Sequence, residues 1–100
     1  MKIKGNLETR NVWIDGECLD PLPSQGVVNH SPDGFNWSYG GSGPSQLALA
    51  ILLYHFPKTT ALRWYQDFKW DIISGLPAGD FEIELDLDEW LEKADEKTKI

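Results

Sequence analysis

Cysteine is nearly absent from this 100-residue sequence, in which Cys18 stands alone. A single cysteine cannot form an internal disulfide, so the fold must be stabilised by its core, and a reducing cytoplasmic setting is favoured. No neighbouring base or oxyanion site accompanies the thiol, as a nucleophile would require. We therefore expect Cys18 to be buried and structural.

Long hydrophobic runs are also missing. The longest apolar stretch, residues 47–56 with His55 as its interruption, is about half as long as a membrane span. The first ten residues lack the apolar segment of a signal peptide. The sequence therefore predicts a soluble cytoplasmic protein that does not contact a membrane.

Basic residues are few, and the net charge is −7. Residues 80–96 contain nine carboxylates and one lysine. Phosphate binding requires clustered lysine and arginine, so direct nucleic-acid binding is disfavoured, whereas a basic protein partner fits this charge. The alternative explanation is solubility and protection of an edge strand from aggregation. The side chains predicted to bind a partner are Glu82, Glu84, Asp88, Glu89 and Glu92.

Potential metal ligands are scarce and scattered. His30 and Asp33 lie near one turn, and His55 lies at the end of a predicted helix. Metal sites typically show short-range ligand spacing, which these residues lack, so structural roles are favoured. The sequence predicts no metal, no cofactor and no catalytic residue.

Apolar residues, by contrast, are plentiful enough for one core. The hydrophobic content is 41%, with five tryptophans among twelve aromatic residues. A chain of this length buries about two-thirds of its unfolded surface, which suits a single domain. We predict one α+β domain over residues 1–96, followed by a frayed tail at residues 97–100.

The first third of the chain predicts β structure. Residues 11–14 are β-prone, and Asp15-Gly16 is a strong hairpin signal that leads into residues 17–19. Further short strands are expected at residues 1–4 and 25–30.

Two helices are predicted next. The segment 44–56 begins with a proline and is apolar on every face, so it should be central and buried. A second, amphipathic helix runs from Thr59 or Thr60 to Ser74 and ends at Gly75, which is expected to be left-handed.

The C-terminal part begins with alternating apolar and acidic residues at 81–85, which predicts a strand with one wet face. Asp86 and Glu89 resemble a capping box that starts a short final helix. Together these patterns predict a small, mainly antiparallel sheet packed on the central helix and the second helix.

A glycine-rich loop precedes the central helix. Exposed N–H groups at a helix start form an anion site, and nearby aromatic rings can stack on a ligand. The loop lacks the lysine of a phosphate loop, so close passage of the backbone into a buried helix is the favoured explanation. The residues predicted to bind a small ligand, if one binds here, are Trp37, Tyr39, Gly40, Gly41, Ser42, Gly43 and Ser45.

The same loop belongs to a longer motif. The tripeptide at residues 30–32, HSP, precedes FNWSYGGSGPSQLALAIL at residues 35–52. This motif resembles the signature of a small prokaryotic domain-of-unknown-function family, found in bacteria, archaea and mobile elements such as phages and plasmids. The resemblance continues through residues 65–69 and 90–91, with Ser38 in place of an expected glycine. It implies the domain limits and the importance of the loop, and it implies no activity.

These observations favour a non-catalytic interaction or regulatory module that acts through an acidic surface. The resemblance adds the context of an accessory protein of a phage, plasmid or other mobile element. The alternative is a protein that binds a small anion or nucleotide at the glycine-rich loop. Neither the partner nor the oligomeric state follows from the sequence.

Overall fold

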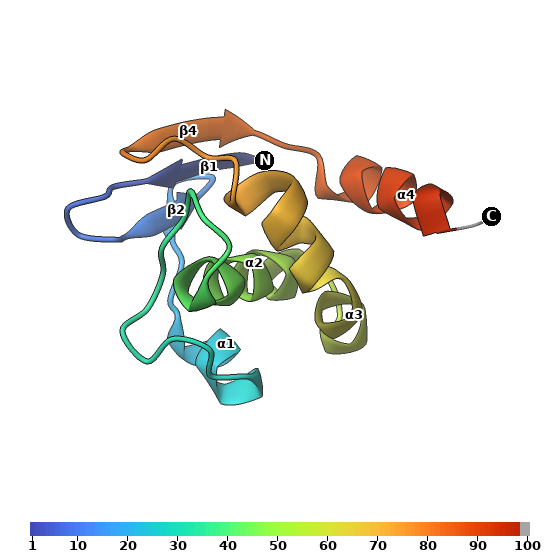
Figure 1. Cartoon of the computed structure of the whole chain (residues 1–100), viewed down its shortest axis with the longest axis horizontal. Helices are drawn as coiled ribbons and strands as arrows, with labels where there is room; N and C mark the ends of the chain where they lie inside the picture. The colour runs from blue at the N-terminus through green and yellow to red at the C-terminus, as the bar shows by residue number, and fades with distance from the viewer. Residues whose placement is uncertain (99–100) are drawn as a thin grey trace.

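The computed structural model describes residues 1–98 and shows a four-stranded antiparallel sheet packed on helices (Figure 1). The strand order is β3-β2-β1-β4, so β3 and β4 form the two edges. This arrangement confirms the predicted α+β fold. The elements are β1 (Lys2–Gly5), β2 (Val12–Ile14), β3 (Glu17–Cys18), α1 (Leu22–Val27), α2 (Ser42–His55), α3 (Lys58–Phe68), the π-helical segment η1 (Lys69–Ile73), β4 (Phe81–Glu84) and α4 (Leu87–Thr98).

The hairpin between β2 and β3 forms at the predicted dipeptide. Asp15 and Gly16 have φ angles of 49° and 83°. Two consecutive positive φ values give the turn that matches the twist of a two-residue hairpin, and Asp-Gly is among its preferred sequences. The predicted strands on either side of this turn are confirmed.

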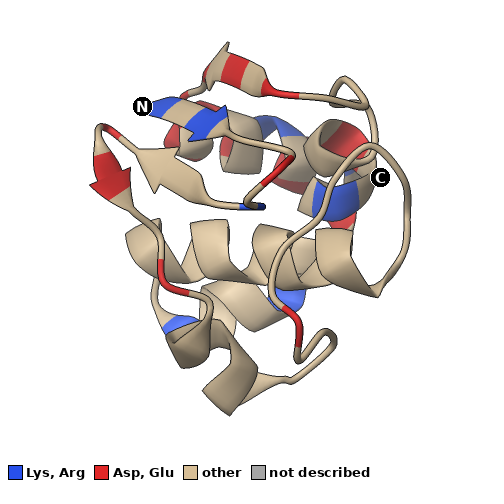
Figure 2. Ribbon diagram, turned by 90° about the vertical axis from the view of Figure 1, so that its left-hand side faces the viewer, with Lys and Arg blue, Asp and Glu red and all other residues tan. Residues whose placement is uncertain are grey.

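The buried face of the sheet rests on α2. Ile3 pairs with Ile14 on one side and with Ile83 on the other, and the first two are fully buried. Helix α2 carries no Lys, Arg, Asp or Glu, so it has no charged face to turn toward water (Figure 2). Its residues 47–52 are all buried, which confirms the predicted central helix.

The predicted strand at residues 25–30 is wrong, because helix α1 occupies Leu22–Val27. Prolines at 21 and 23 lie in the cap and first turn, where the missing N–H costs no helical hydrogen bond. The Asp20 carboxylate accepts the Leu22 N–H at 2.9 Å. Valine, which stands at residues 27 and 28, favours β structure, but this preference is weak and tertiary contacts outweigh it here.

The second predicted helix is confirmed in its extent, but its last turns differ from the expected geometry. It begins at Lys58 rather than at a threonine cap, and it widens into the π-helical segment η1, where the Ser74 N–H donates to the Lys69 carbonyl at 2.8 Å. The wider turn places Ile73 in the core. The expectation of a left-handed Gly75 is wrong, because its φ is not positive.

Helix α4 starts where the capping pattern predicted. The Asp86 carboxylate accepts the Glu89 N–H at 3.0 Å. Lys97 and Thr98, the first two residues of the predicted tail, belong to α4, and positions 99–100 lie outside the described residues. Across residues 1–98, no helix has both the length and the apolar character to cross a membrane.

Candidate functional site

The glycine-rich loop holds its tryptophan inside the core. Trp37 is 1% exposed, and its indole N–H donates to the Gly79 carbonyl at 2.8 Å. Its ring meets the Phe81 ring edge-on at 4.9 Å between centroids. Trp37 therefore joins the loop to β4, and its ring faces are covered by the protein.

The three loop glycines lie against other side chains. A Cβ atom at Gly40 would overlap the Trp70 ring, and one at Gly41 would overlap the Tyr39 ring. At Gly43 a Cβ would lie 2.6 Å from the Asn36 Cβ and 3.1 Å from the Asn36 backbone nitrogen. A side chain at any of these three positions would therefore clash with a neighbour, which explains the glycines by packing alone.

The remaining predicted ligand-binding residues divide between core and surface. Ser45 is buried, and its hydroxyl donates to the Gly41 carbonyl at 3.1 Å. Ser42 is exposed at the first residue of α2. Tyr39 is 48% exposed, and its hydroxyl accepts a hydrogen bond from the Asn36 amide at 3.3 Å. The structure thus brings Tyr39 and Ser42 to the same exposed loop and turns Ser45 inward.

Trp70 is a loop neighbour that the sequence pattern did not reveal. It lies in η1, is 61% exposed and covers Gly40, while the Lys69 ammonium lies 4.4 Å from its ring centroid. The Ile73 carbonyl of the same segment accepts the Ser38 N–H at 3.0 Å. Two exposed aromatic rings, Tyr39 and Trp70, therefore flank the glycine-rich loop.

Gln46 is a second residue whose role was not predicted. Its side chain is fully buried on α2. The amide oxygen accepts the backbone N–H groups of His30 (2.8 Å) and Ser31 (3.0 Å). The amide nitrogen donates to the Ser24 hydroxyl (2.9 Å) and the Val28 carbonyl (3.1 Å). All four hydrogen-bonding positions of this side chain are used, and they attach α1 and the following loop to α2.

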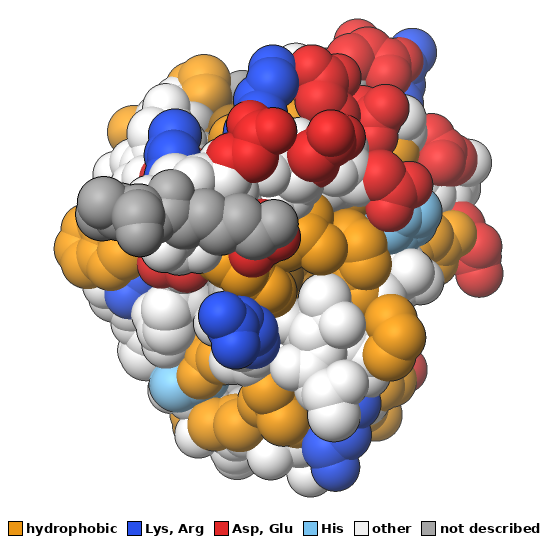
Figure 3. All heavy atoms as spheres, turned by 90° about the vertical axis from the view of Figure 1, so that its right-hand side faces the viewer, with side chains coloured by type: hydrophobic (Ala, Val, Ile, Leu, Met, Phe, Trp, Pro, Cys, Tyr) orange, Lys and Arg blue, Asp and Glu red, His pale blue; other side chains and the backbone are white. Residues whose placement is uncertain are grey.

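The five predicted partner-binding carboxylates lie on two consecutive elements. Glu82 and Glu84 are exposed on β4, and Asp88, Glu89 and Glu92 are exposed on α4. Acidic side chains gather in one region of the face seen in Figure 3, beside apolar side chains. Together, the nine carboxylates at residues 80–96 make up what we call the acidic surface.

Basic groups contact part of this acidic surface; three of them are cations, and His55 is one only when it is protonated. The contacts are Glu82 with Lys4 at 3.1 Å, Glu84 with the N-terminal ammonium at 3.6 Å, Asp88 with His55 at 3.0 Å and Glu89 with Lys93 at 2.8 Å. The hydrogen bond to Glu89 raises the pKa of Lys93, so this cation stays charged. All these carboxylates are more than half exposed, so the pairs contribute little to stability.

A groove of about 420 Å³ separates α3 from α4 on the same side of the molecule. Trp64 and Leu91 contribute apolar surface, Arg63 stands on one wall, and acidic side chains of α4 stand on the other. Trp90 attaches α4 to α3 and η1. Its indole N–H donates to the Asp71 carboxylate at 3.1 Å, and its ring packs edge-on against the Phe68 ring.

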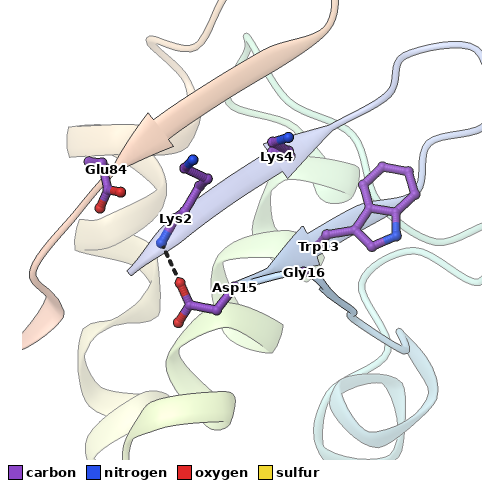
Figure 4. Close-up of a pocket in the computed structure, with 6 residues that line it drawn as sticks. All are labelled: Lys2, Lys4, Trp13, Asp15, Gly16 and Glu84. Atoms are coloured by element: carbon purple, nitrogen blue, oxygen red, sulfur yellow. Dashed lines mark hydrogen bonds between the residues drawn. The ribbon is translucent and has the colours of Figure 1, made fainter.

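The outer face of the sheet forms an open pocket of about 720 Å³ (Figure 4). Lys2 and Lys4 of β1 lie between Trp13 and Asp15 on one side and Glu84 on the other. The Asp15 carboxylate accepts the Lys2 backbone N–H at 2.7 Å. Charges of both signs alternate across this face.

Cys18 is exposed, so the prediction of a buried thiol is wrong. Cys18 lies on the edge strand β3, where it pairs with Trp13 of β2, and both residues of this short strand are exposed.

The two histidines have partners within the fold. The His30 ring nitrogen lies 2.7 Å from the Tyr65 hydroxyl, and the His55 ring nitrogen lies 3.0 Å from the Asp88 carboxylate. Asp33, the potential metal ligand near His30 in the sequence, is exposed on a turn. In the part of the chain that the structure describes, no group of three His, Cys, Asp or Glu side chains could hold a metal ion.

Residues 3–93 match a family of unknown function, DUF6166. The chain belongs to the DUF6166 family. No curated protein and no solved structure matches it. The family match covers the glycine-rich loop, the whole of β4 and most of α4.

The surface of this DUF6166 domain thus offers two regions with distinct chemistry. One is the exposed aromatic pair beside the glycine-rich loop, suited to stacking on a planar ligand. The other is the acidic surface of β4 and α4, with a partly apolar groove beside it, suited to a basic partner.

Proposed function

We propose that this domain is a non-catalytic interaction or regulatory module that binds a basic protein partner through its acidic surface. The observation that carries the proposal is the placement of Glu82, Glu84, Asp88, Glu89 and Glu92 on adjacent exposed elements. Only part of their charge is balanced by neighbouring cations. The groove between α3 and α4 adds apolar area, which affinity requires in addition to charge.

The charge itself supports a role in association. A surface of one sign accelerates encounter with an oppositely charged partner and weakens as salt screens it, with a screening length of about 10 Å at 0.1 M. The carboxylates lie on a strand and a helix of the fold, so they need little ordering when a partner binds.

Neutralising Glu82, Glu84 and Glu92 together to glutamine should abolish salt-sensitive capture of a partner from lysate of the native host. The measurement compares wild type and variant at low and moderate salt, with thermal unfolding as the check that both are folded. The matched control neutralises three exposed acids outside the acidic surface, with Glu8→Gln, Asp20→Asn and Asp33→Asn. The amide oxygen at position 20 can still accept the Leu22 N–H. Equal capture by the two triple variants would contradict the proposal and leave the charge as a solubility feature.

A second candidate is a protein that binds a small anion or nucleotide at the glycine-rich loop. The exposed rings of Tyr39 and Trp70 favour it, together with the exposed Ser42 at the start of α2. The buried Trp37 and the glycines packed against side chains count against it. A nucleotide that raised the melting temperature by several degrees would favour this candidate over the first.

The setting that we propose is the cytoplasm of a prokaryote, where the domain serves as an accessory protein of a phage, plasmid or other mobile element. The resemblance of the motif at residues 30–52 to proteins of such elements supports this context, and the single cysteine supports a reducing compartment.

A further inference from the structure

We propose that β4 binds its partner by strand addition, with an extended basic segment pairing along the free edge of this strand. The inference rests on the proposed function and names the way in which the acidic surface is used. It also names the class of ligand, a segment in which basic and apolar residues alternate.

The hydrogen-bonding pattern leaves one edge of β4 open. The Leu85 N–H donates to the Met1 carbonyl at 2.9 Å. Backbone groups of an antiparallel strand point alternately to its two sides, so Ile83 and Phe81 also bond to β1. Glu82 and Glu84 therefore direct their backbone N–H and C=O groups away from β1. The strand order places no further strand on that side, and β4 runs along the margin of the molecule (Figure 1).

The side chains of β4 specify what could pair there. Residues directly opposite each other in an antiparallel pair have Cβ atoms about 5 Å apart. A lysine or arginine opposite Glu82 and another opposite Glu84 would each meet an exposed carboxylate. The residue between them would lie beside Ile83, which is half-buried on the inner face. The edge thus matches a basic–apolar–basic sequence.

The same geometry disfavours a second copy of this chain. Antiparallel pairing of two β4 strands centred on Ile83 would set Glu82 opposite Glu84 twice. Like charges in directly opposite positions destabilise a strand pair. The two glutamates therefore protect the edge from self-association and leave it open to a basic strand.

The end of β4 allows the added strand to continue. A pocket of about 300 Å³ lies between the end of β4 and the first turns of α4. It presents the apolar side chains of Leu85 and Trp90 with three carboxylates and one lysine, and this lysine, Lys93, pairs with Glu89 at 2.8 Å. A segment that extends past Glu84 would find apolar surface there, together with the carboxylates of Glu84 and Asp86.

The test uses the full chain, isotopically labelled for NMR, and an eight-residue synthetic peptide that alternates lysine with valine or threonine. At ten times its Kd, the peptide should slow amide hydrogen exchange at Glu82 and Glu84 about tenfold. The amides of Ile83 and Leu85, which already donate to β1, should change much less. A peptide of identical composition with its lysines grouped at one end should not protect Glu82 and Glu84.

A variant pair separates the backbone edge from the charge. Glu84→Gln removes the carboxylate, whereas Glu84→Pro also removes the N–H that points to the free edge, a position where an edge strand tolerates proline. The proline variant should bind the alternating peptide at least about tenfold more weakly than the glutamine variant. Thermal unfolding checks that both are folded, and the amide measurement on wild type stands if the proline variant is not.

Three outcomes would overturn the inference: no binding of the alternating peptide, equal binding of the two peptides, or protection confined to α4. In each case salt-sensitive capture that depends on Glu82, Glu84 and Glu92 would leave the proposed function in place. If the alternating peptide did not bind at β4 and the salt-sensitive capture were also absent, both this inference and the proposed function would be contradicted.

Discussion

Replacing Gln46 with leucine is expected to destabilise the chain by about 2–5 kcal/mol, because it leaves buried polar groups without partners. Leucine is close to glutamine in size, so the variant creates little cavity. What it removes is the pair of acceptor bonds to the His30 and Ser31 N–H groups and the pair of donor bonds to Ser24 and Val28. The free energy of unfolding from denaturant titration measures the loss.

The variant Gln46→Glu is a comparison that removes only the two donor hydrogen bonds. Its carboxylate keeps the two acceptor bonds but cannot donate to the Ser24 hydroxyl or the Val28 carbonyl. We expect it to be destabilised as well, because burying an ionised carboxylate adds a desolvation cost. A change within about 0.5 kcal/mol for Gln46→Leu, which is typical of a surface substitution, would show that α1 does not depend on this amide.

Replacing Gly43 with alanine is expected to cost about 1–3 kcal/mol through overpacking. The new Cβ would lie 2.6 Å from the Asn36 Cβ and 3.1 Å from its backbone nitrogen, so the preceding loop must shift. Alanine is the better helix former, by up to about 1 kcal/mol inside a helix, so a net loss means that the clash outweighs this gain. Thermal and denaturant unfolding give the magnitude.

Gly41→Ala is the matched comparison in the same loop. The atoms nearest to its Cβ belong to the Tyr39 ring, a side chain that is 48% exposed and can turn toward water at the cost of one exposed hydrogen bond to Asn36. We expect a smaller loss than at Gly43. If the two variants were equally stable and both matched wild type, the glycines would not be required for packing, and a ligand would become the better explanation of the loop.

The elements that sequence patterns predicted well are those with strong local signals. Asp15-Gly16 encodes its hairpin because both positions need a positive φ. Helix α2 follows from an apolar segment without a polar face, and the cap of α4 follows from the spacing of Asp86 and Glu89. In each case residues adjacent in the chain determine the local geometry.

The elements that were missed depend on contacts distant in sequence. Helix α1 has weak helical signals, and Gln46 on another helix satisfies the backbone that follows it. A glutamine within an otherwise apolar helix was the available signal for this role. The π-helical turn of η1 and the packing of Trp70 on Gly40 leave no sequence periodicity that could reveal them.

Ser38 shows a local backbone requirement that its residue type does not reveal. The resemblance led us to expect glycine at this position, and the structure gives Ser38 a φ of 73°, where glycine is favoured. The loop backbone is therefore left-handed at a serine, and the hydrogen bond from the Ser38 N–H to the Ile73 carbonyl stabilises this conformation. The residues of the glycine-rich loop are thus explained first by backbone conformation and close packing.

The central claim is that the acidic surface of β4 and α4, rather than the glycine-rich loop, contacts the partner. Hydrogen-exchange footprinting of the whole chain, with and without the partner recovered by salt-sensitive capture, tests it most directly. The account predicts that protection rises in residues 82–92 and leaves residues 37–45 unchanged. Protection centred on residues 37–45, with residues 82–92 unchanged, would contradict it.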